Sequence, residues 1–89
     1  MQRFRLIATL PLIVTMLLER GADVNAKIYE GYTALQMASR NRHTEIVAML
    51  LEKGSDVNAQ DKDGYTALIW ASVRGRTEIV AILKEWGAK

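Results

Sequence analysis

The residue types that commonly carry catalysis or hold metals are sparse in this sequence. His43 is the only histidine and cysteine is absent, so thiolate nucleophiles and cysteine-ligated metal sites are excluded. Asp61 and Asp63 stand close together, but the further ligand spacing of a calcium loop does not follow them. They are better interpreted as turn formers, and no glycine-rich phosphate loop is present. The sequence therefore predicts a protein that is not an enzyme and that uses no metal, cofactor or small-molecule substrate.

Length and composition indicate one small globular domain covering residues 1–89. The chain is 49 % hydrophobic and 25 % charged, with six glycines and one proline, which argues against disorder. The net charge of +2 is too small by itself to indicate binding to nucleic acid or to an anionic membrane. The lack of cysteine is compatible with a reducing compartment, so we expect a cytoplasmic protein.

The N-terminal segment offers a competing prediction of secretion. Two early arginines precede a mostly apolar stretch, Leu6 to Leu18, which resembles a secretory signal but is too short to span a membrane. However, residues 13–26 match residues 46–59 at 11 of 14 positions. A cleavable signal has no reason to copy the body of a domain. The sequence therefore favours a truncated structural repeat over a signal peptide.

An internal repeat of 33 residues organises the rest of the chain. Residues 21–53 and 54–86 are identical at 19 of 33 positions without a gap, and both carry the motifs GYTAL and TEIVA. This period predicts stacked structural units. We expect a partial N-terminal unit or cap at residues 1–20, a first unit at 21–53, and a second unit with a C-terminal cap at 54–89.

Each unit is expected to hold two helices. In the second unit, DKDG (residues 61–64) predicts a type I turn, and Thr66 is placed to cap the first helix. The second helix is expected from about Thr77 to a glycine C-cap at Gly87. In the first unit, Ile46, Val47, Leu50 and Leu51 form one apolar helical face. Such short helices need stacking to be stable, so the fold class is all-α.

The unit "DGYTAL…AS…TEIVAIL…G" resembles the ankyrin repeat over about residues 11–89. The resemblance implies a solenoid of stacked helix-turn-helix units with projecting β-turns. It also assigns His43 a structural position between helices. Two departures concern the family's Thr-Pro-Leu-His motif, where the histidine is replaced by Gln36 and Ile69. We expect these replacements to remove a hydrogen-bonding link between units.

Two other departures affect the ends of helices. Arg42 stands where the second unit has Gly75, so a left-handed conformation there would cost about 1 kcal/mol. Lys84 stands where the first unit has the apolar Leu51, which is typical of a polar end cap.

The resemblance implies a protein partner, held by turn tips and by the exposed side of each first helix. Matched positions on this surface differ more between the units than the expected core does, as recognition would require. For Trp70, packing against the neighbouring unit and partner contact both stay open. The apolar turn tip at Ile28 and Tyr29 could contact a partner or, equally, the N-terminal unit. The candidate partner-binding residues are Tyr29, Tyr32, Arg40, Asn41, Lys62, Tyr65, Trp70, Val73 and Arg74.

Charge on this surface leaves two interpretations open. We expect a cluster of arginines at the ends of the first helices, opposite acidic turns containing Glu30, Asp61 and Asp63. The four arginines are Arg40, Arg42, Arg74 and Arg76. This polarity could steer an acidic protein partner, or it could be a solvated edge. Two other functions are alternatives to a protein-interaction module. The chain could be a structural fragment of a longer solenoid, or it could bind nucleic acid electrostatically, although the sequence shows no groove-reading element. We expect a monomer unless the open N-terminal end self-associates.

Overall fold

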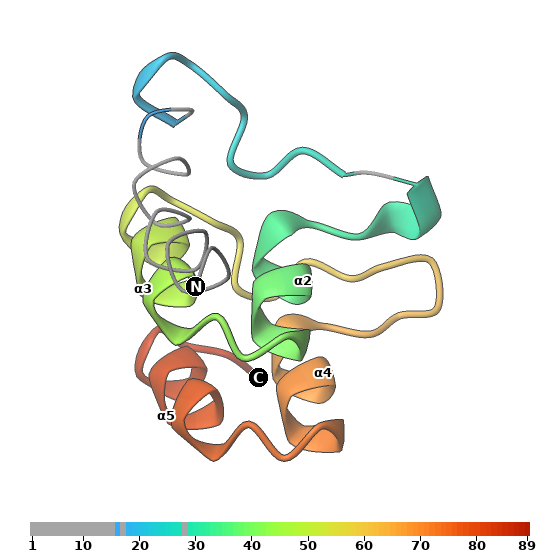
Figure 1. Ribbon diagram of the computed structural model, residues 1–89. Helices are drawn as coiled ribbons and strands as arrows, with labels where there is room; N and C mark the ends of the chain where they lie inside the picture. The colour runs from blue at the N-terminus through green and yellow to red at the C-terminus, as the bar shows by residue number, and fades with distance from the viewer. Residues whose placement is uncertain (1–15, 17, 28) are drawn as a thin grey trace, which may run out of the picture.

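The computed structural model describes residues 16, 18–27 and 29–89, which form four α-helices and one short 3₁₀ turn. The turn η1 spans Tyr29–Gly31, and the helices are α2 (Ala34–Arg40), α3 (Thr44–Glu52), α4 (Ala67–Val73) and α5 (Thr77–Glu85). Helices α2 and α4 lie side by side in one layer, with α3 and α5 in a second layer (Figure 1). The segments that precede α2 and α4 project together beyond the first layer (Figure 1).

The predicted capping residues start and stop the helices. Thr33 Oγ1 accepts from the Gln36 N–H, and Thr66 Oγ1 accepts from the Ile69 N–H, so threonines cap α2 and α4. At the C-terminal ends of α3 and α5, Gly54 and Gly87 adopt φ values of 95° and 89°. The same capping chemistry in both units gives them the same two-helix structure, and the described residues contain no β-strand. The predicted all-α fold is confirmed.

The core lies between the two layers and between successive units. Apolar residues of α3 and α5 pack beneath alanines of α2 and α4, whose small side chains permit close approach of these two helices. The buried core residues are Leu35, Ala38, Ile46, Val47, Leu50, Leu51, Ala67, Ala71, Ile79 and Leu83. Lys84 is exposed on α5, whereas its counterpart Leu51 is buried, and the C-terminal cap stays a prediction.

The repeated linkers GADVNA and GSDVNA join each unit to the next. Asn25 Nδ2 donates to the Gly54 carbonyl, and Asn25 Oδ1 accepts from the Asp56 N–H. Asn58 makes the same pair of bonds with Gly87 and Lys89. The linker sequence is therefore repeated because its asparagine holds the backbone one unit further along.

The expected loss of the link at Gln36 is wrong. Gln36 is almost completely buried, and its Nε2 donates to the carbonyls of Ala59 and Tyr65 in the second unit at 3.0 and 2.9 Å. Its Oε1 also accepts from the Thr33 N–H, which completes a capping box. Glutamine thus supplies the connection that histidine was expected to make, because its amide reaches two carbonyls while accepting at its own helix start.

The strain predicted at Arg42 is present, since this residue has φ of 63° and Gly75 has φ of 69°. Predictions for residues 1–15 and for Ile28 lie outside the described residues, including those for the apolar signal-like stretch and the N-terminal cap. The unit boundaries 1–20, 21–53 and 54–89 stay predictions. Within the described ranges, no helix is long and apolar enough to cross a membrane.

Candidate functional site: the first-helix layer and its turns

The indole of Trp70 on α4 is the centre of an aromatic cluster that crosses the boundary between units. Its ring meets that of Tyr65 at 5.5 Å and that of Tyr32, in the first unit, at 6.0 Å, both edge to face. The guanidinium carbon of Arg40, at the end of α2, lies 5.2 Å from the centre of the same ring. Tyr32, Arg40, Tyr65 and Trp70 were predicted separately from the sequence, and the structure brings them together.

Asp61 holds Trp70 in this orientation. Its Oδ2 accepts from the indole Nε1 at 3.1 Å, and its Oδ1 accepts from the N–H groups of Asp63 and Tyr65. Burial raises the pKa of Asp61, but the bonds from Tyr65, Trp70 and Asp63, together with the charge of Lys27, outweigh it and leave the pKa below its ordinary value. The carboxylate therefore stays ionised at neutral pH and fixes the indole.

This role corrects the predicted acidic surface, because Asp61 is only 6 % exposed. Its carboxylate is occupied by the turn that Gly64 closes through an N–H bond to the Asp61 carbonyl. The turn-forming interpretation of Asp61 is confirmed. Of the three acidic residues proposed for that surface, Asp61 cannot present its charge to a partner.

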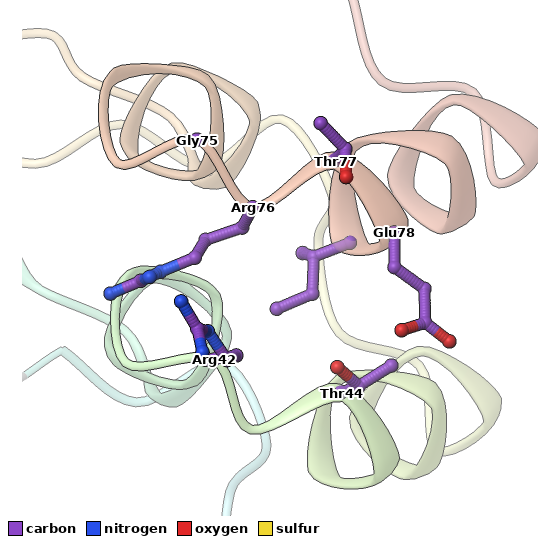
Figure 2. A pocket seen from close by; sticks show the side chains of 7 residues that line it. Arg42, Thr44, Gly75, Arg76, Thr77 and Glu78 are labelled. Carbon is purple, nitrogen blue, oxygen red and sulfur yellow. The ribbon is translucent and has the colours of Figure 1, made fainter.

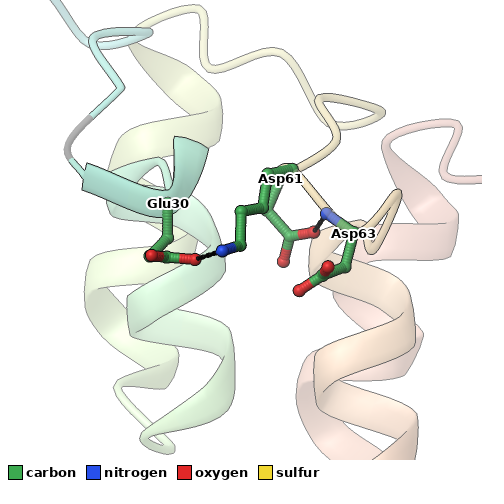
Figure 3. A network of polar contacts seen from close by, with 4 residues as sticks. Glu30, Asp61 and Asp63 are labelled. Atoms are coloured by element: carbon green, nitrogen blue, oxygen red, sulfur yellow. Dashed lines mark hydrogen bonds and ion pairs between the residues drawn. The ribbon is translucent and has the colours of Figure 1, made fainter.

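The turns of the two units are in direct contact (Figure 3). The Lys62 ammonium pairs with the Glu30 carboxylate, and the Lys62 N–H donates to the Glu30 carbonyl at 3.0 Å. Glu30 has φ of 66°, and a Cβ on Gly31 would approach the Lys62 nitrogen to 3.1 Å. Glycine at position 31 thus permits the close contact between turns. Lys62, a predicted partner residue, is exposed but already has an anionic neighbour.

An apolar stripe remains exposed along α4. Ile69 and Val73 are four residues apart, which places them on one side of the helix, and their exposed fractions are 37 and 72 %. Tyr65, which precedes the capping residue of α4, is 44 % exposed. Ile69 was not among the predicted residues. Its replacement of a polar position, four residues before the candidate Val73, was the sequence signal that could have identified it.

The remaining predicted residues have different surroundings. Asn41 caps α2 with its backbone N–H and also donates from Nδ2 to the Met37 carbonyl at 2.8 Å, so it has a local structural bond. Arg74 follows α4 and is exposed. The side chain of Tyr29 lies outside the part of the chain that the structure describes.

A surface pocket of about 210 Å³ lies where the two units meet at the opposite ends of the first helices (Figure 2). Arg42 and Arg76 extend along one side of it, and Thr44 and Glu78 lie on the other. Arg76 Nε donates to the Arg40 carbonyl at 3.2 Å. Three of the four arginines predicted to cluster are therefore neighbours, whereas Arg74 is not among the residues that line this pocket.

The surroundings of His43 and the side chains displayed on the first-helix layer bear on what the site can do. His43 links the helices through its backbone, where its N–H donates to the Ala38 carbonyl and its own carbonyl accepts from Val47. Among the described residues, no group of three or more histidine and acidic side chains could hold a metal ion. The geometry instead presents aromatic, apolar and guanidinium groups on one layer, which are the groups that anchor protein interfaces.

Comparison with known proteins agrees with the architecture. A family model described as ankyrin repeats (3 copies) matches residues 8–89. A 34-residue segment is 59 % identical to part of the probable E3 ubiquitin-protein ligase XBOS33 from Oryza sativa subsp. japonica. That segment is 38 % of this chain but 6 % of the rice protein, so the likeness covers a small part of that protein. The 33-residue period, the paired helices and the match over most of the sequence show that the chain belongs to the ankyrin repeat family.

Proposed function

We propose that this chain is a non-catalytic protein-interaction module whose turns and first helices hold a protein partner. Ankyrin repeats are generally protein–protein interaction modules, which supports the class of function. We call the proposed contact surface the recognition face and define it by the described candidate residues Tyr32, Arg40, Asn41, Lys62, Tyr65, Trp70, Val73 and Arg74, with Ile69 added.

The single observation that supports this face best is the aromatic cluster with its exposed apolar border. Trp70 is fixed by Asp61 and flanked by two tyrosines, while Tyr65 and Val73 leave 44 and 72 % of their surfaces exposed. Side chains that are already ordered lose little conformational entropy when a partner binds. The mechanism is rigid display, in which the helices hold the backbone and the exposed side chains select the partner.

The test uses a library of displayed random peptides selected on the purified 89-residue chain. Val73→Asp is expected to weaken binding of the selected peptides at least tenfold, because it places a charge in the apolar border. Ala81→Asp is the matched control, since Ala81 is exposed on α5, outside the recognition face. Circular dichroism verifies that both variants are folded. Binding that survives Val73→Asp but is lost in Ala81→Asp would assign the partner to the other helix layer, and failure to select any peptide would also count against the proposal.

A structural role within a longer solenoid is the second candidate, and Ile69 favours it. Gln36 binds the following unit, whereas Ile69 at the matched position leaves 37 % of its surface exposed. A thermal melt at two protein concentrations separates the candidates. A cooperative transition independent of concentration supports a self-standing monomeric module, while a broad or concentration-dependent transition supports a unit that needs neighbours.

We place this function in the cytoplasm, as the lack of cysteine suggests. Nucleic-acid binding is not part of the proposal. Such binding would weaken steeply with added salt. A gel-shift titration at low salt that showed tight, salt-sensitive binding would contradict the proposed partner class.

A further inference from the structure

Arg40 on the recognition face differs from Lys27 and Lys62, whose ammonium groups have partners, in having an aromatic support and no anionic neighbour. Its guanidinium lies over Trp70, and among the described residues no carboxylate pairs with it. Its Nε is buried without an acceptor. Lys62, in contrast, pairs with Glu30, and Lys27 donates from Nζ to the Gln60 carbonyl at 2.9 Å.

Two acids of the turns that precede α2 and α4 are committed elsewhere. Glu30 is paired with Lys62, and the buried Asp61 carboxylate accepts three hydrogen bonds from its own unit. The positive charge of Arg40 is therefore not neutralised within the described part of the protein. A planar guanidinium held by an aromatic ring is arranged to receive a carboxylate through two parallel hydrogen bonds.

The matched position in the second unit has the opposite character. Val73 corresponds to Arg40 and is 72 % exposed, with the exposed Ile69 one turn before it on the same side of α4. The recognition face thus places a cation on one unit and an apolar contact on the next. A partner that is purely acidic or purely apolar would match only half of this pair.

We propose that the recognition face binds an extended acidic–apolar segment of a partner protein, with its carboxylate on Arg40 and its apolar side chain against Val73 and Ile69. This inference rests on the proposed function and names the chemistry of the partner. Packed helices lie about 8–10 Å apart, and an extended chain rises about 3.1–3.4 Å per residue. The acidic and apolar residues of the partner are therefore separated by two or three positions.

The experiment repeats the peptide selection on the wild-type chain, on Arg40→Glu and on Lys84→Glu. Lys84→Glu is the control because it makes the same change of charge at an exposed position on α5. Wild type and Lys84→Glu are expected to select Asp or Glu two or three positions from Leu, Ile, Val or Phe. Arg40→Glu is expected to lose this acidic preference and to select Lys or Arg in its place.

A synthetic peptide from the wild-type pool, titrated by fluorescence anisotropy, measures the contact directly. We expect Arg40→Glu to weaken binding at least tenfold and Lys84→Glu less than twofold. Arg40→Met keeps an aliphatic stem against Trp70 and should weaken binding to the same extent as replacing the peptide carboxylate with its amide. Combining these two changes should cause little further loss, because both remove the same contact.

The outcomes separate this inference from the function on which it rests. Peptides that are lost in Val73→Asp but bind Arg40→Met as tightly as wild type would leave the recognition face intact and overturn the acidic contact. A wild-type pool without acidic enrichment would overturn it as well. If no peptide is selected at all, the proposed function fails together with this inference.

Discussion

The first unit (residues 21–53) and the second unit (54–86) have the same backbone structure. Side chains at matched positions nevertheless have different surroundings in the two units. Both units have a first helix that begins within the motif GYTAL and is capped by its threonine. Each unit also has an asparagine that binds the backbone one unit further along. Yet the Gln36 side chain is buried and bonded where Ile69 is exposed, and Arg42 adopts a left-handed conformation that Gly75 adopts without strain. The shared threonine and asparagine therefore make the same bonds in both units, whereas the side chains at the divergent positions 36 and 69 have different surroundings.

This comparison shows that a position in the repeat has no fixed role of its own. A side chain that faces a following unit must satisfy that unit, whereas the same position with access to water is free to be apolar or charged. Exchanging matched residues between the units therefore tests the comparison directly, and the exchanges should be strongly asymmetric.

The largest asymmetry is expected at Leu51 and Lys84. Leu51→Lys places an ammonium where the side chain is 3 % exposed, and we expect a loss of about 4 kcal/mol in the free energy of unfolding. The reverse exchange, Lys84→Leu, occurs at an exposed position and should change it by less than about 0.5 kcal/mol. Urea unfolding followed by circular dichroism measures both. Equal effects would show that the two helices have equivalent surroundings.

The next exchange is at Gln36 and Ile69. Gln36→Ile removes the donor to the Ala59 carbonyl and the acceptor of the Thr33 N–H, so we expect a loss of about 2 kcal/mol. Ile69→Gln should be close to neutral because its side chain has access to water. The same urea titrations compare the variants, and a neutral Gln36→Ile would mean that the link between units contributes nothing.

The Asp61–Trp70 pair belongs to the second unit, where Trp70 replaces Met37. Asp61→Asn turns an N–H donor toward the Trp70 indole, and we expect a loss of about 1.5 kcal/mol at pH 7. Because the pKa of Asp61 lies below its ordinary value of 3.8, the carboxylate contributes its full stabilisation above that pH. This contribution is lost as the pH falls further and the folded protein takes up the proton. Thermal melts from pH 2 to 7 should show the gap between wild type and variant closing below about pH 3.8.

The smallest exchange concerns the left-handed residues. Arg42→Gly relieves the strain at φ of 63°, but it adds freedom to the unfolded chain, so we expect a net gain of about 0.5 kcal/mol. The Cβ added by Gly75→Ala would meet no atom within 4 Å, but the alanine would be strained at φ of 69°. We therefore expect a loss of about 1 kcal/mol in the free energy of unfolding. Differential scanning calorimetry resolves changes of this size. Destabilisation by Arg42→Gly would show that the arginine side chain contributes more than its backbone strain costs.

The sequence predicted the repeating backbone because its signals are local. Thr66 starts a helix through a hydrogen bond to a residue three positions away, and Gly87 ends one through its positive φ angle. Both effects involve only nearby residues, so they can be predicted without knowledge of the fold. The roles of Gln36 and Asp61 were misjudged because they depend on atoms outside the local motif. Which carbonyls Gln36 reaches is decided by the distance between units, and the Asp61 carboxylate accepts from an indole N–H nine residues further along the chain.

The candidate site was predictable as a set of residues but not as an arrangement. A periodic pattern places Tyr32 and Tyr65 on one side of the stack, yet it contains no rotamer information and so could not show that both rings meet Trp70. The position of Arg40 over the Trp70 ring also depends on side-chain rotamers, so the sequence could not predict it. Their use in binding a partner remains a prediction.

The bonds of Gln36 also bear on the order in which the two units can fold during synthesis. During synthesis the first unit leaves the ribosome before the second, but its buried amide has its acceptors at Ala59 and Tyr65. Until those residues emerge, α2 cannot be covered without leaving the amide unpaired. We therefore expect a nascent chain ending before residue 59 to stay protease-sensitive, and structure to spread back toward the N-terminus once the second turn is available.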